Sequence, residues 1–541
     1  MAIATFSRKR FEREIGKLDE KMQEKISMFG TPFESANSEE INIEIFPNRP
    51  DLFSFEGFKR SFLSYLGKAK IKKYTAKKSN YFIEVDKSVE DVRPYTVCAV
   101  VKNINFDDDK IKEVIDVQEK LHATIARNRK KAAIGIYPLE KIKFPIRYLA
   151  RPPQEIHFVP LESNVKMYGD EILEQLFVGR TYSHLLRGKK LYPVFIDAND
   201  NILSMPPIIN SNDTGKITEK TKDVFIECSG FNLSILNKIL NILVCMFADM
   251  NGEIYEVKIK YHGKKEIITP NLKEEKIKIN IKNFNKFLGL NLKENEIKKL
   301  LEKMNYEYKN KIVYVPPYRT DILHEVDLIE DVAIAYGYDN ITAEIPSIAT
   351  IGKEDSKEII KRKISDLLLG LDMLEVSSYH LINKEFLKKI GYNENIEVEN
   401  SKTDYSILRP SLLSSVMKIL SENIDAEYPQ RIFELGKIFT LENEKIKEKD
   451  SLVVAISSAD SNFTKIKQVL DYIERMLNIK LEIKEFENSI FIPGRAGKII
   501  LDKKEIGFIG EVHPSLIKKL KIKMPISVFE IGLEEIFNKF Q

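Results

Sequence analysis

The chain has 541 residues, more than one hydrophobic core usually serves, so several domains are expected. Lys and Arg outnumber Asp and Glu by only 4, so the overall charge gives no sign of a nucleic-acid partner. The cysteines Cys98, Cys228 and Cys245 lack C-x-x-C spacing, which argues against a disulfide framework and a cysteine zinc site. We recognise no export signal and no membrane-spanning stretch, and therefore expect a cytoplasmic location.

Residues 1–80 are predicted to form an N-terminal domain followed by a linker. Residues Ile41–Ile45 alternate between apolar and polar side chains, which predicts a strand. The Pro- and Asn-rich segment Pro47–Asp51 predicts a turn, and a helix is expected from Ser54 to Leu66. The lysine-rich stretch 68–78 is typical of a solvated connector.

Residues 81–265 are predicted to form a mixed α/β domain, because short β-rich runs alternate with helical stretches. The clearest examples are the strands Tyr95–Val101 and Val194–Ile196 and the helix Lys110–Arg127.

Residues 266–345 are predicted to form a small winged-helix-like module with two helices, Ile281–Leu288 and Glu294–Met304, before a strand at Val313–Val315. Residues 354–541 are expected to form a large α+β domain. Its clearest elements are a helix over Ser356–Leu369 and strands over Arg431–Phe439 and Leu452–Ser457. The fold class is therefore multidomain α+β.

A cluster of carboxylates follows the last strand of the small module. The segment 321–333 has helical apolar spacing, with Asp321 as its predicted N-cap. Asp327, Glu330 and Asp331 are three and four positions apart, so they share one helix face, and the segment has no Lys or Arg to compensate them. Such an oxygen-rich cluster suits Mg²⁺. The alternative is a solvated acidic helix, with His324 as a bystander.

The stretch 315–321, followed by these acidic residues and by the Tyr-Gly-Tyr-Asp of 336–339, resembles the B5 domain of phenylalanyl-tRNA synthetase beta subunits. The resemblance implies that Asp321, Asp327, Glu330 and Asp331 bind Mg²⁺ at the contact with an alpha subunit.

Two further segments resemble the same family, so the likeness spans nearly the whole chain. They are Phe46–Leu52 near the N-terminus and Gly507–Pro514 near the C-terminus. The short architecture is similar to the archaeal or eukaryotic cytosolic type. The resemblance implies an alpha2-beta2 heterotetramer that binds tRNA(Phe), and ATP-dependent attachment of phenylalanine on the alpha subunit. It also implies a C-terminal class II catalytic-like domain without catalytic activity.

The central domain contains two segments, 121–131 and 203–211, that resemble the B3/B4 editing domain of this family. The resemblance implies that Arg127, Asn128 and Arg129 bind tRNA, because Arg side chains hold phosphates and Asn supplies a donor and an acceptor. The alternative is a basic helix end that interacts with the helix dipole.

The segment 225–230 is similar to the strand that carries the editing site of the family. In a strand Glu227 and Ser229 face the same side, and the resemblance gives them and Ser204 substrate-positioning roles in hydrolysing Tyr-tRNA(Phe). The family usually has Asp and Thr where Glu227 and Ser229 stand in this chain. The alternative function is therefore a structural and tRNA-docking subunit with a decayed editing site.

The segments 408–413 and 430–437 resemble parts of the catalytic-like fold. We expect them to serve in packing and in contacts with the alpha subunit. No phosphate-binding G-x-x-x-x-G-K-[ST] motif occurs in the sequence, so independent ATPase activity is not expected.

Overall fold

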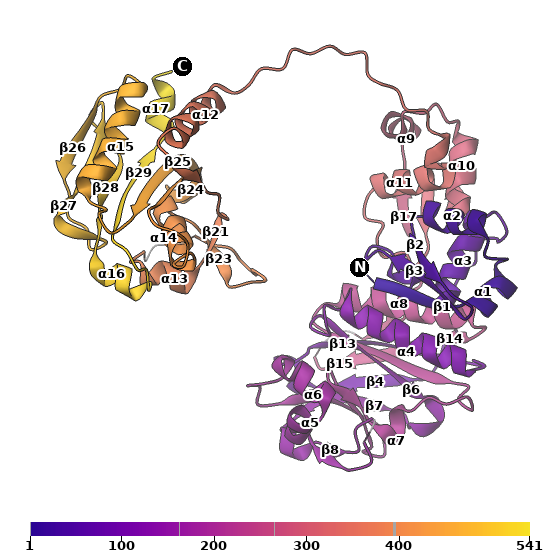
Figure 1. Cartoon of the computed structure of the whole chain (residues 1–541). Coiled ribbons are helices and arrows are strands. Elements are labelled where there is room, and N and C mark those ends of the chain that lie inside the picture. The colour runs from indigo at the N-terminus through magenta and orange to yellow at the C-terminus, as the bar shows by residue number, and fades with distance from the viewer. Residues whose placement is uncertain (1, 162, 264–265, 393–395, 541) are drawn as a thin grey trace. The chain divides into compact units, whose positions relative to one another are not determined.

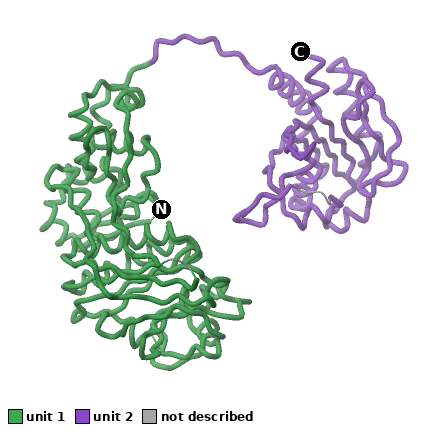
Figure 2. The backbone as a smooth tube through the Cα atoms, turned by 180° about the vertical axis from the view of Figure 1, so that it is seen from behind, with its two compact units in different colours: residues 1–345 green, residues 346–541 purple. Residues whose placement is uncertain are grey.

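The computed structural model describes residues 2–161, 163–263, 266–392 and 396–540. The chain divides into two units, residues 1–345 and residues 346–541 (Figure 2). The three domains predicted within the first 345 residues all belong to the first unit. Their buried side chains form one continuous hydrophobic cluster that runs from Ala4 to Ala335. Their internal boundaries therefore stay predictions.

The N-terminal part of the first unit is a three-stranded antiparallel sheet with strand order β1-β3-β2 and three helices. Aromatic rings hold it together, since Phe58 packs against Phe6, Phe29 and Phe62. Ser54 caps helix α3, as the sequence predicted. The elements are β1 (Ala2–Ser7), α1 (Arg8–Glu14), α2 (Glu20–Met28), β2 (Phe33–Ala36), β3 (Glu40–Ile45) and α3 (Phe55–Tyr65).

The central part contains two sheets, one of seven strands in the order β12-β11-β10-β7-β4-β15-β16 and one of four in the order β14-β5-β13-β6. Helices α4 and α8 contact the four-stranded sheet (Figure 1). The strands are β4 (Phe82–Val85), β5 (Tyr95–Lys102), β6 (Ala132–Pro138), β7 (Ile146–Arg151), β10 (Tyr192–Ile196), β11 (Ile202–Met205), β12 (Ile209–Asn210), β13 (Val224–Gly230), β14 (Glu253–Tyr255), β15 (Val257–Tyr261) and β16 (Ile267–Thr269). The helices are α4 (Asp108–Ala123), α5 (Gly169–Gln175), α6 (Phe177–Tyr182), α7 (Asn212–Gly215) and α8 (Leu233–Asp249), and β8 (His157–Phe158) pairs with β9 (Met167–Tyr168).

Helix α4 is shorter at its C-terminal end than the sequence predicted. The backbone at Arg127, Asn128 and Arg129 has φ of 49°, 51° and 63°, which a right-handed helix cannot include. The helix has already ended at Ala123, because Thr124 leaves the helical region with φ of −91° and ψ of −93°, and residues 127–129 lie in the loop that leads into β6.

The small module has the predicted helix-helix-strand order. Its elements are β17 (Glu275–Lys278), α9 (Ile281–Leu288), α10 (Glu294–Lys303), β18 (Glu307–Lys309), β19 (Ile312–Val315) and α11 (Glu325–Tyr336). The predicted N-cap was wrong, because α11 begins four residues after Asp321. Nδ1 of His324 accepts from the backbone N–H of Val326 and caps the helix instead.

The second unit is built on a seven-stranded sheet with strand order β20-β24-β25-β29-β28-β27-β26. Helices α12 and α15 pack on one face, and α14 packs on the other (Figure 1). The strands are β20 (Leu374–Glu375), β24 (Gln430–Glu442), β25 (Lys445–Ser457), β26 (Leu481–Glu485), β27 (Phe491–Leu501), β28 (Lys504–Val512) and β29 (Ile526–Gly532). A small sheet holds β21 (Leu381–Asn383), β22 (Ile396–Glu397) and β23 (Tyr405–Leu408). The helices are α12 (Ser356–Leu369), α13 (Lys384–Lys389), α14 (Leu412–Glu422), α15 (Phe463–Met476), α16 (Pro514–Lys519) and α17 (Glu534–Asn538).

In the part of the chain that the structure describes, no helix has both the length and the apolar character needed to cross a membrane. The three cysteines, Cys98, Cys228 and Cys245, are buried free thiols.

Candidate functional site

Glu227 lies in the interior of the central domain, on strand β13. Its cross-strand neighbours are Cys98 on β5 and Gly135 on β6. Only 1% of its surface is exposed. A carboxylate in this position has lost nearly all contact with water, so its protein partners decide whether it can carry a charge.

The carboxyl group of Glu227 has one hydrogen bond within the described residues. Its Oε1 accepts from the hydroxyl of Tyr137 at 3.2 Å, and its Oε2 has no partner. Burial raises the pKa of Glu227 to about 8, and the Tyr137 hydroxyl and the Arg93 guanidinium oppose that rise only in part. At neutral pH the carboxyl group is therefore largely protonated and can donate a hydrogen bond from one oxygen.

Ser204, on β11, is a second buried polar group in need of a partner. Its Oγ has no hydrogen bond of good geometry among the described residues, although the Tyr137 hydroxyl is close enough to interact with it. Tyr137 lies near it, and the Tyr137 hydroxyl also approaches Oδ1 of Asn210 at 3.4 Å. An unsatisfied buried polar group costs about 1–3 kcal/mol, and such groups usually mark a site for water or a ligand. Ser204 and Glu227 thus belong to one buried polar cluster around the Tyr137 hydroxyl.

Gly135 makes room for the side chains of Tyr137 and Glu227. A Cβ atom at Gly135 would lie 2.2 Å from the hydroxyl oxygen of Tyr137 and 2.5 Å from Oε1 of Glu227. Any larger residue would push these two groups out of position. The sequence did not single out Tyr137 or Gly135, because nothing in their local pattern distinguishes them from ordinary strand residues. Asn210 lies in the segment 203–211 that resembles the editing domain, but no role was predicted for it.

Ser229 faces the same side of β13 as Glu227 but is held by a different group. Its Oγ accepts from Nε of Arg93 at 3.2 Å, and its backbone oxygen accepts from Nη2 of Arg93 at 2.7 Å. Arg93 is buried, and its own backbone oxygen accepts from the hydroxyl of Tyr148. Arg93 was not predicted as a site residue, since it lies 136 positions from Ser229.

The predicted tRNA-binding residues differ in their surroundings. Arg127 and Asn128 are exposed, whereas Arg129 is buried. Nη1 of Arg129 donates to the backbone oxygen of Ile208 at 2.7 Å, and Nη2 donates to Glu119 at 2.9 Å. Arg129 therefore ties its loop to the segment that follows β11. Its part in binding tRNA stays a prediction.

A cavity of about 710 Å³ opens beside Arg93. Lys130 and Lys131 line it, and so does Phe231, whose side chain is 50% exposed. The Phe231 ring lies 5.3 Å from the Arg93 guanidinium. The cavity thus combines positive charge with an exposed aromatic ring. Arg93, which lines the cavity, also binds Ser229.

The acidic residues near α11 are more fully engaged than the sequence predicted. Both oxygens of Asp321 accept from Arg319, at 2.9 and 2.8 Å, and Asp331 accepts from Arg319 at 2.8 Å and from the hydroxyl of Tyr306. Oδ2 of Asp327 accepts from the backbone N–H groups of residues 323 and 324. The compensating cation is Arg319, two residues before the segment in which the sequence showed none.

The pKa values of these carboxyl groups reflect the same arrangement. Burial alone would raise the pKa of Asp321, but the Arg319 guanidinium outweighs it and holds that pKa below its usual value. The pKa of Glu330 is raised by partial burial and by the negative charges of Asp331, Asp327 and Asp321. Glu330 is the exposed member of the four.

A metal ion held by all four predicted ligands does not fit this arrangement. Within the described residues, no three His, Cys, Asp or Glu side chains form a group that could hold a metal ion. Asp321 in particular has both oxygens bound by Arg319. The oxygens left for a hard cation are those of Glu330 and the second oxygens of Asp327 and Asp331.

The turn at residues 47–51 and the stretch 315–321, two motifs far apart in the chain, lie close together in this region. Arg49 and Asp51 form a two-bond fork at 2.9 Å, of the same kind as the fork between Arg319 and Asp321. The side chain of Arg60 bridges the two motifs, since its guanidinium lies 3.5 Å from the ring of Tyr318 and 3.9 Å from Asp51. The turn near the N-terminus therefore supports the start of the acidic segment.

In the second unit, Arg409 is packed in the interior, as expected for this segment. It is 1% exposed, and its guanidinium donates to Glu434 at 2.6 Å, to the hydroxyl of Ser378 at 2.7 Å and to the backbone oxygen of Lys437 at 2.7 Å. The arginine has no free face toward solvent for a nucleotide.

Two models of known protein families match parts of the chain. Residues 277–338 match the family model described as the tRNA synthetase B5 domain, and residues 341–533 match that of the phenylalanyl tRNA synthetase beta chain CLM domain.

Among curated proteins, the chain is 42% identical to the phenylalanine–tRNA ligase beta subunit of Pyrococcus horikoshii over 505 residues, which covers 91% of this chain and 90% of that protein. It is 38% identical to the subunit of the same name from Archaeoglobus fulgidus over an alignment 550 residues long, which covers 99% of each chain. Among solved structures, an N-terminal fragment of the Pyrococcus horikoshii phenylalanyl-tRNA synthetase beta subunit is similar, with a TM-score of 0.59 and 38% identity over 62% of this chain and 99% of the fragment.

Proposed function

The chain belongs to the phenylalanine–tRNA ligase beta subunit family, as its motifs predicted, and from this premise we propose that it joins an alpha subunit in a cytoplasmic alpha2-beta2 heterotetramer. In this proposal the alpha subunit uses ATP to attach phenylalanine to tRNA(Phe). The beta subunit contributes assembly, tRNA docking and hydrolytic editing. The packing of Arg409 against Glu434 supports this division, because it leaves the class II-like unit without an open arginine at that position.

The editing role is the part that this chain performs by itself. It would hydrolyse Tyr-tRNA(Phe), the product formed when tyrosine is attached in place of phenylalanine. The observation that supports the proposal is the pair of unsatisfied polar atoms, Oε2 of Glu227 and Oγ of Ser204, in the buried polar cluster around Tyr137. A site built to hydrogen-bond a hydroxyl rejects the analogue that lacks it, because the polar groups of the site then stay unpaired.

The side chains have separate roles in this proposal. Glu227 and Ser204 bind the tyrosine hydroxyl, and Tyr137 fixes the orientation of Glu227. Arg93 holds Ser229 with its hydroxyl hydrogen free to donate to the ester. Water then adds to the ester carbonyl carbon, the bond to the ribose oxygen breaks, and that oxygen leaves with a proton. No side chain needs to act as a nucleophile.

The cavity beside Arg93 is where the end of the tRNA would approach. Exposed aromatic rings stack on unpaired bases, and lysines neutralise phosphates. Lys130, Lys131 and Phe231 supply these groups, and Arg127 and Asn128 are exposed in the adjoining loop.

The decisive experiment measures release of tyrosine from Tyr-tRNA(Phe) by the assembled enzyme. We expect Glu227→Gln and Ser204→Ala to lower the deacylation rate by at least about tenfold, the effect of losing one or two hydrogen bonds to the substrate. Glu505→Gln, an exposed change on β28, is the matched control and should have no effect. If the unaltered enzyme does not deacylate Tyr-tRNA(Phe), the alternative of a docking subunit with a decayed editing site is correct.

The magnesium prediction becomes a narrower proposal. Mg²⁺ commonly takes one or two carboxylates and keeps several waters. Glu330, together with a free oxygen of Asp327 or Asp331, can supply these ligands, whereas Asp321 serves as the partner of Arg319. When bound, the ion would neutralise the exposed acidic face of α11 at the contact with the alpha subunit.

Assembly with the alpha subunit tests this proposal. The double variant Asp327→Ala, Glu330→Ala should weaken the complex in sedimentation experiments and should make assembly insensitive to chelation of Mg²⁺. Glu325→Ala is a control, because its carboxylate binds Asn280 and Asn283 within the module. If chelation weakens the double variant as much as the unaltered chain, the ion binds elsewhere.

A further inference from the structure

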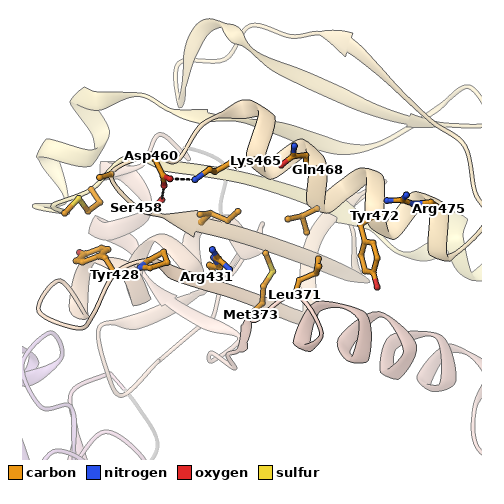
Figure 3. Close-up of a pocket in the computed structure, with 15 residues that line it drawn as sticks. Leu371, Met373, Tyr428, Arg431, Ser458, Asp460, Lys465, Gln468, Tyr472 and Arg475 are labelled. Carbon is orange, nitrogen blue, oxygen red and sulfur yellow. Dashed lines mark hydrogen bonds and ion pairs between the residues drawn. The ribbon is translucent and has the colours of Figure 1, made fainter.

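A second cavity, of about 670 Å³, lies in the unit of residues 346–541, between helix α15 and the loop that follows α12 (Figure 3). Its floor is apolar, because Met373, Ile456 and Val469 line it and are buried. Pockets of roughly 300–1,000 Å³ with an apolar floor and a few convergent polar groups are typical small-ligand sites. The function proposed above makes no use of this cavity.

The cavity lies on the other face of the sheet from the interior arginine. Arg431, which lines the cavity, and Glu434, which binds Arg409, are three positions apart on β24. Successive side chains of a strand point to opposite faces, so the two residues face opposite ways. A ligand in the cavity would therefore be separated from the catalytic-like face of the sheet.

Three cations and one carboxylate line the cavity. Lys465 is paired with Asp460, so these two charges compensate each other. The carboxylate nearest to Arg431 is Asp372, at 3.8 Å, and solvent screens that pair because the Asp372 side chain is 97% exposed. Arg475 has no carboxylate within 4 Å among the described residues. Two guanidinium groups thus border the cavity without a strong anionic partner.

Two tyrosines accompany these arginines. Tyr472 is three positions before Arg475 on α15, and the Arg475 guanidinium lies 6.0 Å from its ring. Figure 3 shows Tyr472 extending from the helix toward the side of Leu371 and Met373. Tyr428 lines the cavity from the segment before β24. Aromatic rings stack on nucleobases, and guanidinium forks bind phosphates with two hydrogen bonds.

We propose that this cavity binds a nucleotide, with its base against a tyrosine ring and its phosphate on Arg431 or Arg475, the two guanidinium groups that border the cavity. The nucleotide could come from the free pool or from an unpaired end of RNA, because the recognised chemistry is the same. The proposal concerns binding alone. It does not depend on editing in the central domain, which lies in the other unit.

The test uses the complete chain and three probes: AMP, the trinucleotide CCA and inorganic phosphate. Titration calorimetry should detect binding of AMP. Either Arg431→Gln or Arg475→Gln, whichever removes the guanidinium that holds the phosphate, should raise its Kd by at least about tenfold, as expected for losing a charge-assisted hydrogen bond. Tyr472→Leu should weaken binding of AMP but not of phosphate. Arg362→Gln is the matched control, because Arg362 lies on α12 and binds Glu354 at 2.7 Å and 2.8 Å.

The probes also distinguish the two sources of the nucleotide. Binding of AMP without CCA identifies a site for free nucleotide, and competition between AMP and CCA identifies a site for an RNA end. The proposal is overturned if neither probe binds, or if both arginine variants bind as the unaltered chain does. It is also overturned if CCA binding persists in Arg431→Gln and is lost in Lys130→Gln, because the RNA then binds in the central domain. Should a variant unfold early, Arg431→Lys keeps the charge and should still weaken binding of AMP.

Discussion

The central domain and the second unit each bury carboxylates, but these groups differ in how many hydrogen bonds they accept. In the second unit, both oxygens of Glu530 accept hydrogen bonds, from the hydroxyls of Ser411 and Ser451 and from the backbone N–H groups of Leu412 and Leu413. In the central domain, Glu227 has one donor, and its second oxygen has none among the described residues. Burial raises the pKa of both groups.

The difference is the one expected between a purely structural network and a proposed binding site. A fully satisfied buried network stabilises a single arrangement of the surrounding strands. A partly satisfied one lowers stability, and a protein keeps it where a ligand completes it. By this criterion Glu530 and Glu434 hold the sheet of the second unit together, whereas the unsatisfied atoms of Glu227 and Ser204 agree with the substrate-binding role that we propose for them.

The largest expected effect comes from Glu227→Gln and depends on pH. The pKa of Glu227 is about 8 in the folded chain, against an ordinary 4.5, so between these values the folded state binds more protons than the unfolded state. This group therefore lowers stability as the pH rises through that window, by on the order of 5 kcal/mol in total. Gln cannot ionise, so the variant should match the unaltered chain near about pH 4 and exceed it above about pH 8.

Denaturant unfolding at several pH values, followed by circular dichroism, measures this difference. A constant difference between Glu227→Gln and the unaltered chain would mean that the pKa of Glu227 is the same in the folded and unfolded states, and would contradict the raised pKa.

The next effect comes from breaking the satisfied pair in the second unit. Arg409→Met leaves Glu434 buried without its cation, which should destabilise this unit by about 3–5 kcal/mol. The midpoint of its guanidinium chloride transition measures the loss. Lys498→Met is the control, because its pair with Glu505 is exposed and should contribute less than about 1 kcal/mol. Equal shifts in the two variants would contradict a structural role for Arg409.

The smallest effect tests how closely the side chains of Tyr137 and Glu227 pack against Gly135. In Gly135→Ala the new methyl group would contact Tyr137 and Glu227, and overpacking of this kind costs about 1–3 kcal/mol. Thermal unfolding measures the cost. Gly532→Ala is the control, since its nearest neighbour would lie at an ordinary 3.5 Å. If both variants have the same unfolding temperature, Tyr137 and Glu227 can shift at little cost, and they are then too loosely held to position a substrate.

Much of the secondary structure could be predicted, because its signals are local. The apolar spacing of Ile281–Leu288 and Ser356–Leu369 gave both helices with the bounds that the structure has. The errors were also local. Helix α4 ended early because the backbone leaves the helical region at Thr124, and α11 began late because His324 rather than Asp321 caps it.

The sequence by itself determined the family, the α+β class, most helices and strands, and the placement of Glu227 and Ser229 on one face of a strand. Each of these follows from motifs or from periodicity within a few residues. Only the tertiary structure decided the partners: Tyr137 for Glu227, Arg93 for Ser229, and Tyr306 together with Arg319 for Asp331. Most of these pairs are far apart in the chain, and sheet pairing and core packing bring them together, so local sequence patterns carry no record of them.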